Sequence, residues 1–248
     1  MFHQELEDYT GRLLEVDRFR DYCPNGLQVE GDRNIRKIAT GVTASLSFLE
    51  KARDAGADAV LVHHGYFWKS EDARIAGIKR GRIELLLKSG MSLFAYHLPL
   101  DAHPDLGNNA RLGQMLGFSF ESRFGDQGIA MLGEIDRPLS LDALEKRVSE
   151  KLSRPPLIVG KKPKIVKRIA WCSGAAQGYL LEAAKLGADA YLSGEISEQT
   201  VHEAEESGIA YLCAGHHATE RYGIMALGEH LASRFDLEHE FIDTDNPV

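Results

Sequence analysis

The sequence predicts an α/β fold made of two similar domains that follow one another along the chain. Aligned without a gap, segments 35–64 and 166–195 share ten identical residues in thirty positions, and the longest shared run is Gly56–Ala59 against Gly187–Ala190. Internal similarity of this kind is typical of a repeated structural unit. The chain has 248 residues, 44% of them hydrophobic, which is enough to bury two modest cores.

The first half alternates predicted helices with short apolar strands. An amphipathic helix is expected near the start, at Gln4–Val16. A capping-box signature, Ser47-x-x-Glu50, predicts the start of a second helix that ends at Gly56, and a third is expected over Arg82–Lys88. The strands expected between them are Ile35–Val42, Ala59–Val62 and Ser92–Tyr96. This order favours parallel strands covered by helices.

The second half repeats the order of the first after a strand over Ile129–Ile135 and a helix over Leu141–Leu152. The join is expected within Ser119–Gln127, which gives two pseudo-duplicated α/β domains, 1–123 and 124–248. The remaining expected elements are the strands Leu157–Val159, Ile165–Cys172, Ala190–Leu192, Ile209–Ala214 and His239–Ile242, and the helices Leu180–Leu186, Thr200–Ser207 and Ile224–Ser233.

Composition and charge exclude several classes of protein. The net charge of −8 opposes a surface that coats DNA, so a nucleic-acid partner is not expected. No apolar run is long enough to span a membrane, and the first residues do not resemble a signal peptide. Cys23, Cys172 and Cys213 form no CxxC pair, so we expect reduced thiols rather than a disulfide framework or a thiolate zinc site. A cytoplasmic protein is expected.

Two histidines directly follow the expected strand Ala59–Val62, and Gly65 comes next. Neighbouring residues on a regular strand point to opposite faces, so His63 and His64 are expected to serve one site only if the chain leaves the strand there. Glycine makes such a departure easy. In open parallel sheets, ligands commonly bind outside the carboxyl ends of the strands. The pair therefore suggests two metal ions, with one histidine for each.

A His-x-x-x-acid pattern occurs in both halves, each time after a short apolar run. His97 and Asp101 form it in the first half, and His216 and Glu220 form it in the second. One histidine at a strand end is usually a hydrogen-bonded structural residue, but recurrence of the pattern favours a metal site. Mixed nitrogen and carboxylate ligands suit zinc, iron, manganese or nickel, so we expect two divalent metal ions held by His63, His64, Asp101, His216 and Glu220.

The other acidic and imidazole side chains leave more than one interpretation open. Glu195 aligns with His64, so it is either a base beside the metal ligands or a cap for the following helix. His217 is a weaker candidate than His216, which already occupies the position equivalent to His97. Structural roles are expected for the remaining histidines, His3, His103, His202, His230 and His239.

Four motifs carry a family resemblance: PNGLQVEG at 24–31, VHHGYFWK at 62–69, HLPLDAHP at 97–104 and GHHATE at 215–220. They closely resemble the YbgI group of the NIF-three-like family, often labelled GTP cyclohydrolase 1 type 2 homologues, and the match covers nearly the whole chain. The resemblance implies two interlocked domains, a ring-shaped homo-hexamer and a dinuclear metal site in the cleft between the domains. The ligands that it implies are the five side chains named above.

Two functions of different classes fit these residues. The first is a metal-dependent hydrolase acting on a nucleotide, in which His97 or Glu195 moves protons. The family label implies GTP ring opening, a cyclohydrolase-like reaction, and a phosphoesterase would use the same site. The alternative is a metal storage or metal-delivery protein without turnover, which needs the same ligands but no proton shuttle. A scaffold that acts on DNA through a central hole is opposed by the acidic composition.

Overall fold

The chain forms two compact units, and neither of them is one continuous stretch of sequence. The computed structural model describes residues 1–32 and 34–248. Unit 1 contains residues 1–107 and 223–245, and unit 2 contains residues 108–222 and 246–248. The expected division at 123/124 falls inside strand β5 (Phe118–Phe124), which pairs with β6 (Ala130–Leu139) in one sheet. The compact units therefore differ from the sequential halves.

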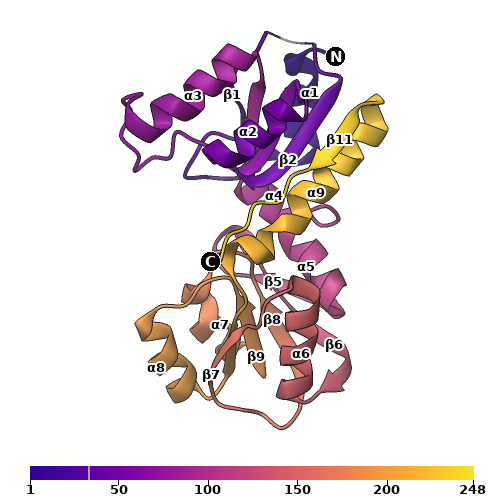
Figure 1. Cartoon of the computed structure of the whole chain (residues 1–248). Helices are drawn as coiled ribbons and strands as arrows, with labels where there is room; N and C mark the ends of the chain where they lie inside the picture. The colour runs from indigo at the N-terminus through magenta and orange to yellow at the C-terminus, as the bar shows by residue number, and fades with distance from the viewer. Residues whose placement is uncertain (33) are drawn as a thin grey trace. The chain divides into compact units, whose positions relative to one another are not determined.

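Unit 1 is built on a mostly parallel sheet with the strand order β1-β4-β3-β2-β11. Parallel pairs join β11 to β2, β2 to β3 and β3 to β4, whereas β1 runs antiparallel to β4 at one edge. Figure 1 labels β1, β2 and β11, with β11 in yellow because it comes from the end of the chain. Their bounds are β1 Gly26–Val29, β2 Lys37–Thr43, β3 Ala59–His64, β4 Ser92–Ala95 and β11 Glu238–Phe241.

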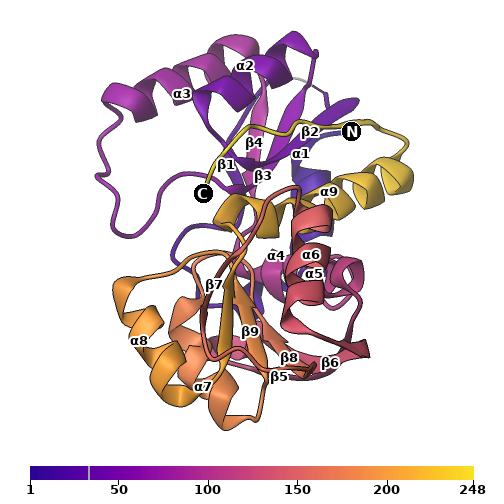
Figure 2. The same cartoon turned by 60° about the horizontal axis from the view of Figure 1, so that its bottom comes forward.

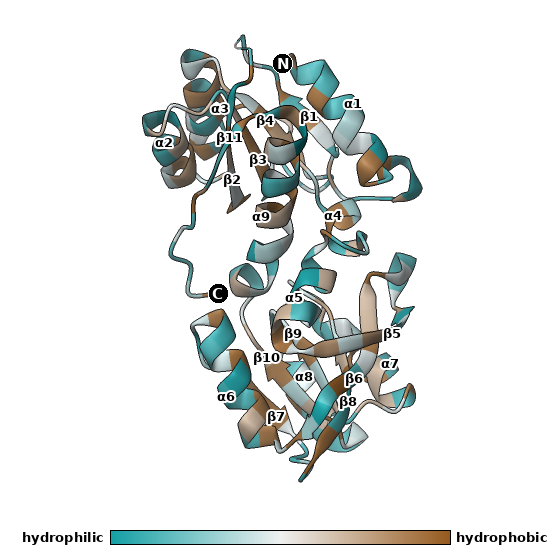
Figure 3. Cartoon of the chain, turned by 90° about the vertical axis from the view of Figure 1, so that its right-hand side faces the viewer, coloured by the Kyte–Doolittle hydropathy of each residue, from teal (hydrophilic) through white to brown (hydrophobic). Residues whose placement is uncertain are grey.

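Helices cover both faces of this sheet, as an α/β fold requires. Helices α2 (Leu46–Asp54) and α3 (Gly77–Ser89) lie on one face, where Phe48 and Leu86 pack on Val60 and Leu93. The other face is covered by α1 (His3–Leu13), α4 (Leu98–Ala102) and the later part of α9 (His216–Phe235). Figure 2 shows α2 and α3 on the opposite side of the sheet from α1 and α9. Figure 3 shows the buried strand β3 as a hydrophobic stretch.

Unit 2 is built on a mixed sheet with the order β5-β6-β8-β9-β10-β7. The central strands β8, β9 and β10 are parallel, and the outer pairings, β5 with β6, β6 with β8 and β10 with β7, are antiparallel. The bounds not yet given are β7 Leu157–Gly160, β8 Val166–Trp171, β9 Ala190–Ser193 and β10 Ala210–Cys213.

Two hydrophobic clusters lie on the two faces of the second sheet. One includes Trp171 and Leu192 with α5 (Asn108–Leu116) and α6 (Leu141–Leu152), and the other includes Tyr191 and Tyr211 with α7 and α8. The alternation of Leu192 with Tyr191 follows from the two-residue period of a strand. The elements not yet bounded are α7 Leu180–Lys185, α8 Glu198–Ser207 and the short 3-10 turns Val16–Arg18, Asp126–Gly128 and Gln177–Tyr179.

The two units share a β-α-β-α-β order and matching contacts at its first crossover. In unit 1, Asp58 accepts hydrogen bonds from the backbone N–H groups of Arg36 and Lys37, at 2.9 and 3.1 Å. In unit 2, Asp189 accepts two bonds of 2.9 Å from the equivalent residues, Lys167 and Arg168. The shared spacing found by aligning the two segments thus corresponds to one local geometry, present twice.

Most expected elements are present, and the differences have local causes. Helix α6 has the expected bounds. The capping box at Ser47 is wrong, because Ser45 caps α2 by accepting a hydrogen bond from Phe48 N. Helix α9 begins at His216 rather than at Ile224. Strand β5 occupies most of the expected join. Among the described residues, no helix combines the length and apolarity that crossing a bilayer needs.

Candidate metal centre

In unit 1, the imidazoles of His63 and His64 lie close together although both residues belong to β3. Their ring centroids are 4.6 Å apart, and β3 ends at His64, so the chain leaves the strand directly after the pair. Strand β4 ends at Ala95, opposite Val62, so β3 has lost one neighbour by this point. The His63 ring is fully buried, and its Nδ1 lies 2.9 Å from Tyr96 O, whereas His64 Nδ1 lies 3.2 Å from Thr43 Oγ1.

His97 joins these two histidines and is oriented by a carboxylate. Its ring centroid lies 5.0 Å from that of His63 and 5.8 Å from that of His64. Its Nδ1 lies 2.7 Å from Oδ1 of Asp21, whose other oxygen, Oδ2, accepts a hydrogen bond from Leu98 N at 2.9 Å. One ligand atom from each of the three imidazoles lies within 4.8 Å of the others. These three histidines, all expected site residues, belong to one group of candidate metal-site residues in unit 1, and this group is called the half-site of unit 1.

Asp101 completes this half-site. It lies on α4, which begins directly after His97, and its side chain is buried. Its Oδ1 lies 3.5 Å from Nε2 of His63. The short helix places the two ends of the His-x-x-x-acid pattern on one turn. A carboxylate facing an imidazole nitrogen at this distance is a suitable pair of ligands for one divalent ion.

Side chains of the PNGLQVEG motif hold the loops that follow β3 and β4 through hydrogen bonds. Asn25 accepts a hydrogen bond from His97 N at 2.7 Å and donates one to Asp21 at 2.8 Å. Gln28 accepts from the backbone N–H of Tyr66 at 2.7 Å and donates to its carbonyl at 3.1 Å. A Cβ at Gly65 would lie 2.1 Å from Gln28 Oε1, so only glycine fits between the histidines and this clamp.

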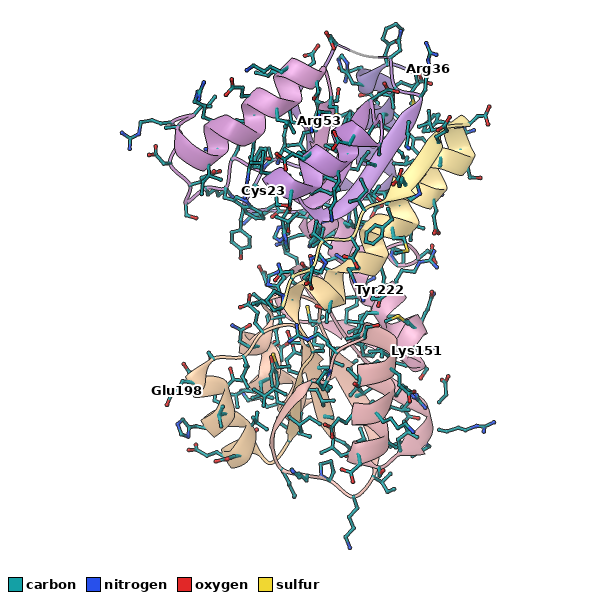
Figure 4. All side chains as sticks on the ribbon, in the orientation of Figure 1. Cys23, Arg36, Arg53, Lys151, Glu198 and Tyr222 are labelled. Carbon is teal, nitrogen blue, oxygen red and sulfur yellow. The ribbon has the colours of Figure 1, made fainter. Side chains whose placement is uncertain are left out.

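Unit 1 contains a second group of possible metal ligands, Asp21, Cys23 and His97. This group is less suited to binding a metal ion. Burial, followed by the charge of Asp21, raises the pKa of the Cys23 thiol to about 12, so the sulfur stays protonated. Metal binding needs the thiolate. Cys23, labelled in Figure 4, is a buried free thiol, as expected from the cysteine spacing. The Asp21 carboxylate instead orients the imidazole of His97 through the contact with Nδ1.

In unit 2, His216, Glu220 and Glu195 come together at the start of α9. His216 is the first residue of the helix and Glu220 lies one turn later, with its Oε2 3.1 Å from His216 Nε2. On the other side of the ring, His216 Nδ1 lies 2.7 Å from Glu195 Oε1. The alternative that Glu195 caps the next helix is wrong, because Ser197 and Thr200 form the capping box of α8.

These carboxylates hold a proton on His216 in the metal-free protein. Burial opposes the charged ring, but the hydrogen bonds and charges of Glu220 and then Glu195 raise the pKa of His216 from 6.5 to about 9. Glu195 also makes the ring a strong ligand once that proton leaves, because a carboxylate on Nδ1 fixes the tautomer and increases the basicity of Nε2.

The backbone beside Glu220 is close enough to exclude a side chain. A Cβ at Gly174 would lie 2.1 Å from Glu220 Oε1 and 3.3 Å from His216 Nε2. Gly174 also has a positive φ of 64°, which favours glycine. Its N–H donates to Thr219 Oγ1 at 3.0 Å, so the loop is fixed to the first turn of α9. Because Gly174 has no Cβ, space remains beside the carboxylate oxygens of Glu220.

The arrangement fits a divalent metal centre on its donor chemistry. His63, His97 and His216 each direct Nδ1 at an oxygen acceptor, and a neutral imidazole protonated on Nδ1 offers its lone pair from Nε2. Metal-ligating histidines characteristically have such partners.

Most of the other histidines make the contacts expected of structural residues. His103 accepts hydrogen bonds from Asp105 N and Leu106 N. The other contacts are His3 with Glu30, His202 with Glu198, His230 with Tyr9 and His239 with Thr40.

Sequence reasoning missed two residues that shape these half-sites. Asp21 lies in a loop without periodicity, 76 positions before His97. Its position just before the PNGLQVEG motif is the only signal in the sequence that indicates a functional role. Gly174 follows the β8 strand end, at a position that motif spacing does not mark. The sequence predicted the candidate metal ligands but not the groups that orient them or leave space beside them.

Comparison with known proteins decides the family. A model of Duf34/NIF3 (NGG1p interacting factor 3) matches residues 1–247. The chain belongs to the Duf34/NIF3 family. Its relatives in this family include a "GTP cyclohydrolase 1 type 2 homolog" of Allochromatium vinosum, 52% identical over 246 residues, which cover 99% of this chain and 97% of the relative. The resemblance predicted from the four motifs is thus confirmed.

Solved Duf34/NIF3 relatives share the fold over the full length. The structure titled "Structural genomics, protein ybgI, unknown function" matches with a TM-score of 0.97 and 46% identity, covering 100% of both chains. The crystal structure of TTHA1606 from Thermus thermophilus matches with a TM-score of 0.91 and 32% identity, again over 100% of both chains. The α/β class expected for this Duf34/NIF3 chain is confirmed.

Proposed function

We propose that this Duf34/NIF3 chain is a metal-dependent hydrolase with two divalent ions, held by His63, His64, Asp101, His216 and Glu220. The observation that carries the proposal is the orientation of the imidazoles. His216 has a carboxylate on Nδ1, and His63 has a carbonyl there, so each offers Nε2 to a buried acidic side chain. Metal-ligating histidines characteristically have such an oxygen partner on the ring nitrogen that does not bind the metal.

We propose further that the two half-sites join in one dinuclear centre in the cleft between two pseudo-duplicated domains. The repeated His-x-x-x-acid pattern supports this proposal, as do the matching contacts of Asp58 and Asp189. Zinc, iron, manganese or nickel would suit the ligands. A joined centre makes a sharp prediction: a change in either unit lowers the affinity for both ions, whereas independent half-sites would each lose one ion separately.

The residues around the centre have distinct roles in the proposed reaction. When bound, two divalent ions activate water and stabilise a developing oxyanion. His97, with Nδ1 fixed by Asp21, presents Nε2 for proton transfer, and Glu195 holds His216 in its ligating tautomer. A nucleotide is the proposed substrate, supported by the relatives named GTP cyclohydrolase 1 type 2 homolog. Ring opening of GTP and hydrolysis of a phosphoester are both within reach of this chemistry.

The test loads purified protein with one defined metal and follows GTP, nucleoside mono- and diphosphates, and model phosphoesters. His216→Ala and Glu220→Ala are expected to abolish turnover. The matched control is His202→Ala with Glu198→Ala, since this pair also has the i, i+4 spacing and a contact of 2.9 Å, but on the surface of α8. Figure 4 shows Glu198 projecting away from α8. The control pair should leave turnover unchanged.

Two other results would redirect the assignment. Tight stoichiometric metal binding without turnover of any of these compounds would favour storage or delivery of metal. Loss of turnover in the surface control as well as in the site variants would show that the assay reports folding rather than chemistry. Metal analysis of each variant separates these cases, because the site variants alone should lose bound metal.

We also propose a ring-shaped homo-hexamer that acts in the cytoplasm. The family resemblance supports the assembly, and the three free cysteines are consistent with a reducing compartment. Native mass spectrometry tests the assembly directly. A mass of six chains is expected, and a stable monomer or dimer at micromolar concentration would contradict the proposal.

A further inference from the structure

The loop after the histidine pair adopts an unusual backbone conformation. Phe67 has a positive φ of 63°, a region that non-glycine residues rarely adopt and that is often kept at functional sites. Glu71 stabilises this turn, because its Oε2 accepts hydrogen bonds from Phe67 N at 2.8 Å and Trp68 N at 3.3 Å. The conformation is therefore held by a specific side chain.

A buried lysine fixes that carboxylate. Lys79 is 8% exposed, and its ammonium lies 3.2 Å from Glu71 Oε1. The same ammonium donates to the Asp72 carbonyl at 2.6 Å and lies 5.4 Å from the centre of the Phe67 ring. Burying a lysine is costly unless its charge is paired, as it is here. The loop thus uses a paired buried charge to hold one strained turn.

The result of this turn is the placement of Trp68 against the half-site of unit 1. Its indole N–H donates to Gly65 O at 3.2 Å, which turns the ring back toward the strand end. The ring centroid lies 5.0 Å from that of His97, with the planes at 84°, and 6.0 Å from that of His64. Trp68 remains partly exposed.

A second aromatic ring lies on the other loop that borders His97. Tyr22 is 58% exposed, and its ring centroid lies 6.4 Å from that of His97. The two loops are joined, since Lys69 N donates to Tyr22 O at 2.8 Å and Lys69 Nζ donates to Asp21 O. Two exposed or partly exposed aromatic rings therefore lie beside one histidine, on loops that are joined by hydrogen bonds.

We propose that Trp68 and Tyr22 form an aromatic platform that stacks a planar heteroaromatic ring, such as a nucleobase, beside His64 and His97. Every base has a π face, so stacking on aromatic side chains binds bases without reading their edges. The inference rests on the proposed function and narrows its substrate class to compounds with such a ring. It also gives the VHHGYFWK motif one purpose, because the histidines and the tryptophan are set by one loop.

Tryptophan fluorescence tests the platform, because the chain has two tryptophans and Trp171 is 1% exposed. The probes are GMP, UMP and ribose 5-phosphate, added to metal-loaded protein. GMP should quench emission in the wild type but not in Trp68→Phe, and ribose 5-phosphate should quench neither. Calorimetry should show GMP affinity roughly tenfold or more lower in Trp68→Ala, and lower again when Tyr22→Ala is added.

Phe120→Ala is the matched control, since Phe120 is 57% exposed on β5 in the other unit, and it should leave GMP affinity unchanged. Circular dichroism confirms that each variant folds, and bound metal is measured separately. If metal binds normally while Trp68→Ala leaves GMP and UMP affinity unchanged, or if ribose 5-phosphate binds as well as GMP, the platform is refuted and the metal centre stands. Failure of the wild-type protein to bind metal would instead contradict the proposed function.

Discussion

Asp21 Oδ1 lies 2.7 Å from Nδ1 of His97, across 76 residues of sequence. The contact fixes which nitrogen of His97 faces the neighbouring imidazoles. We predict that Asp21→Ala lowers turnover about 10- to 100-fold and leaves metal affinity nearly unchanged, because Asp21 orients the proposed proton-transfer histidine rather than a proposed ligand. Metal titration and the pH profile of turnover check this. An exposed acid in the same unit, Asp54, provides the control through Asp54→Ala.

The same carboxylate gives metal-free protein a stability that depends on pH. Burial alone would raise the pKa of Asp21, but the hydrogen bond and charge of His97, with bonds from Asn25 and Tyr22, lower it from 3.8 to about 2. A lowered pKa stabilises the fold above the unfolded value and loses that effect as the pH falls. Roughly 2 kcal/mol should be lost between about pH 4 and pH 2, and Asp21→Asn should flatten this part of an acid denaturation curve.

Metal binding should release a proton at neutral pH. His216 has a pKa of about 9, so the metal-free ring is charged and its ion pairs stabilise the fold fully below 6.5 and lose that effect as the pH rises through 9. Metal affinity should therefore increase with pH, by up to about tenfold per unit, until the ring is neutral. Calorimetry at pH 7 in buffers of different ionisation enthalpy counts the protons. Equal heats in all the buffers would contradict the prediction.

Gly174→Ala should empty the acidic half-site while the fold survives. The new Cβ would lie 2.1 Å from Glu220 Oε1, so the carboxylate must move. We expect metal affinity to fall at least about tenfold, as for other changes that displace a ligand. Gly187→Ala is the matched control, because Gly187 also has a positive φ, of 81°, and no atom lies within 4 Å of the Cβ position there. Metal affinity that is unchanged in both variants would show that Glu220 does not ligate.

The repeated crossover can be tested through stability. Asp58→Ala and Asp189→Ala each leave two backbone N–H groups without a carboxylate acceptor. Each change should lower the free energy of unfolding by about 1–3 kcal/mol, measured by urea denaturation. Similar losses are expected because the contacts match. A loss confined to one aspartate would mean that the two copies no longer contribute equally to stability.

Periodicity and motif spacing predicted much of this fold. The stripe of Leu144, Val148 and Leu152 located α6 because one face of that helix is fully buried. Strand β5 was missed because it lies at an edge with most of its side chains exposed, so it has no apolar signal. Ser47 and Ser45 are equally good caps by residue type, and only the backbone angles choose between them.

The return of 223–245 to unit 1 could not be predicted for a different reason. Helix α9 is apolar over much of its length, and an apolar face does not specify which sheet it covers. The candidate metal ligands could be predicted because histidines and acids recur at matching strand ends. Their supports could not, because Asp21 and Gly174 act through distant partners, which one sequence does not connect.

The interleaving of the units has a consequence for synthesis on the ribosome. Ile38 and Leu61 of the first sheet pack with Ile224 and Leu227 of α9, and β11 pairs with β2. Domains usually fold in the order in which they emerge. Here all of 108–222 leaves the exit tunnel before the last strand of the earlier sheet emerges. A nascent chain that has emerged only as far as residue 222 should therefore hold a second unit that lacks residues 246–248 and a first unit still open at one edge, where chaperones can bind.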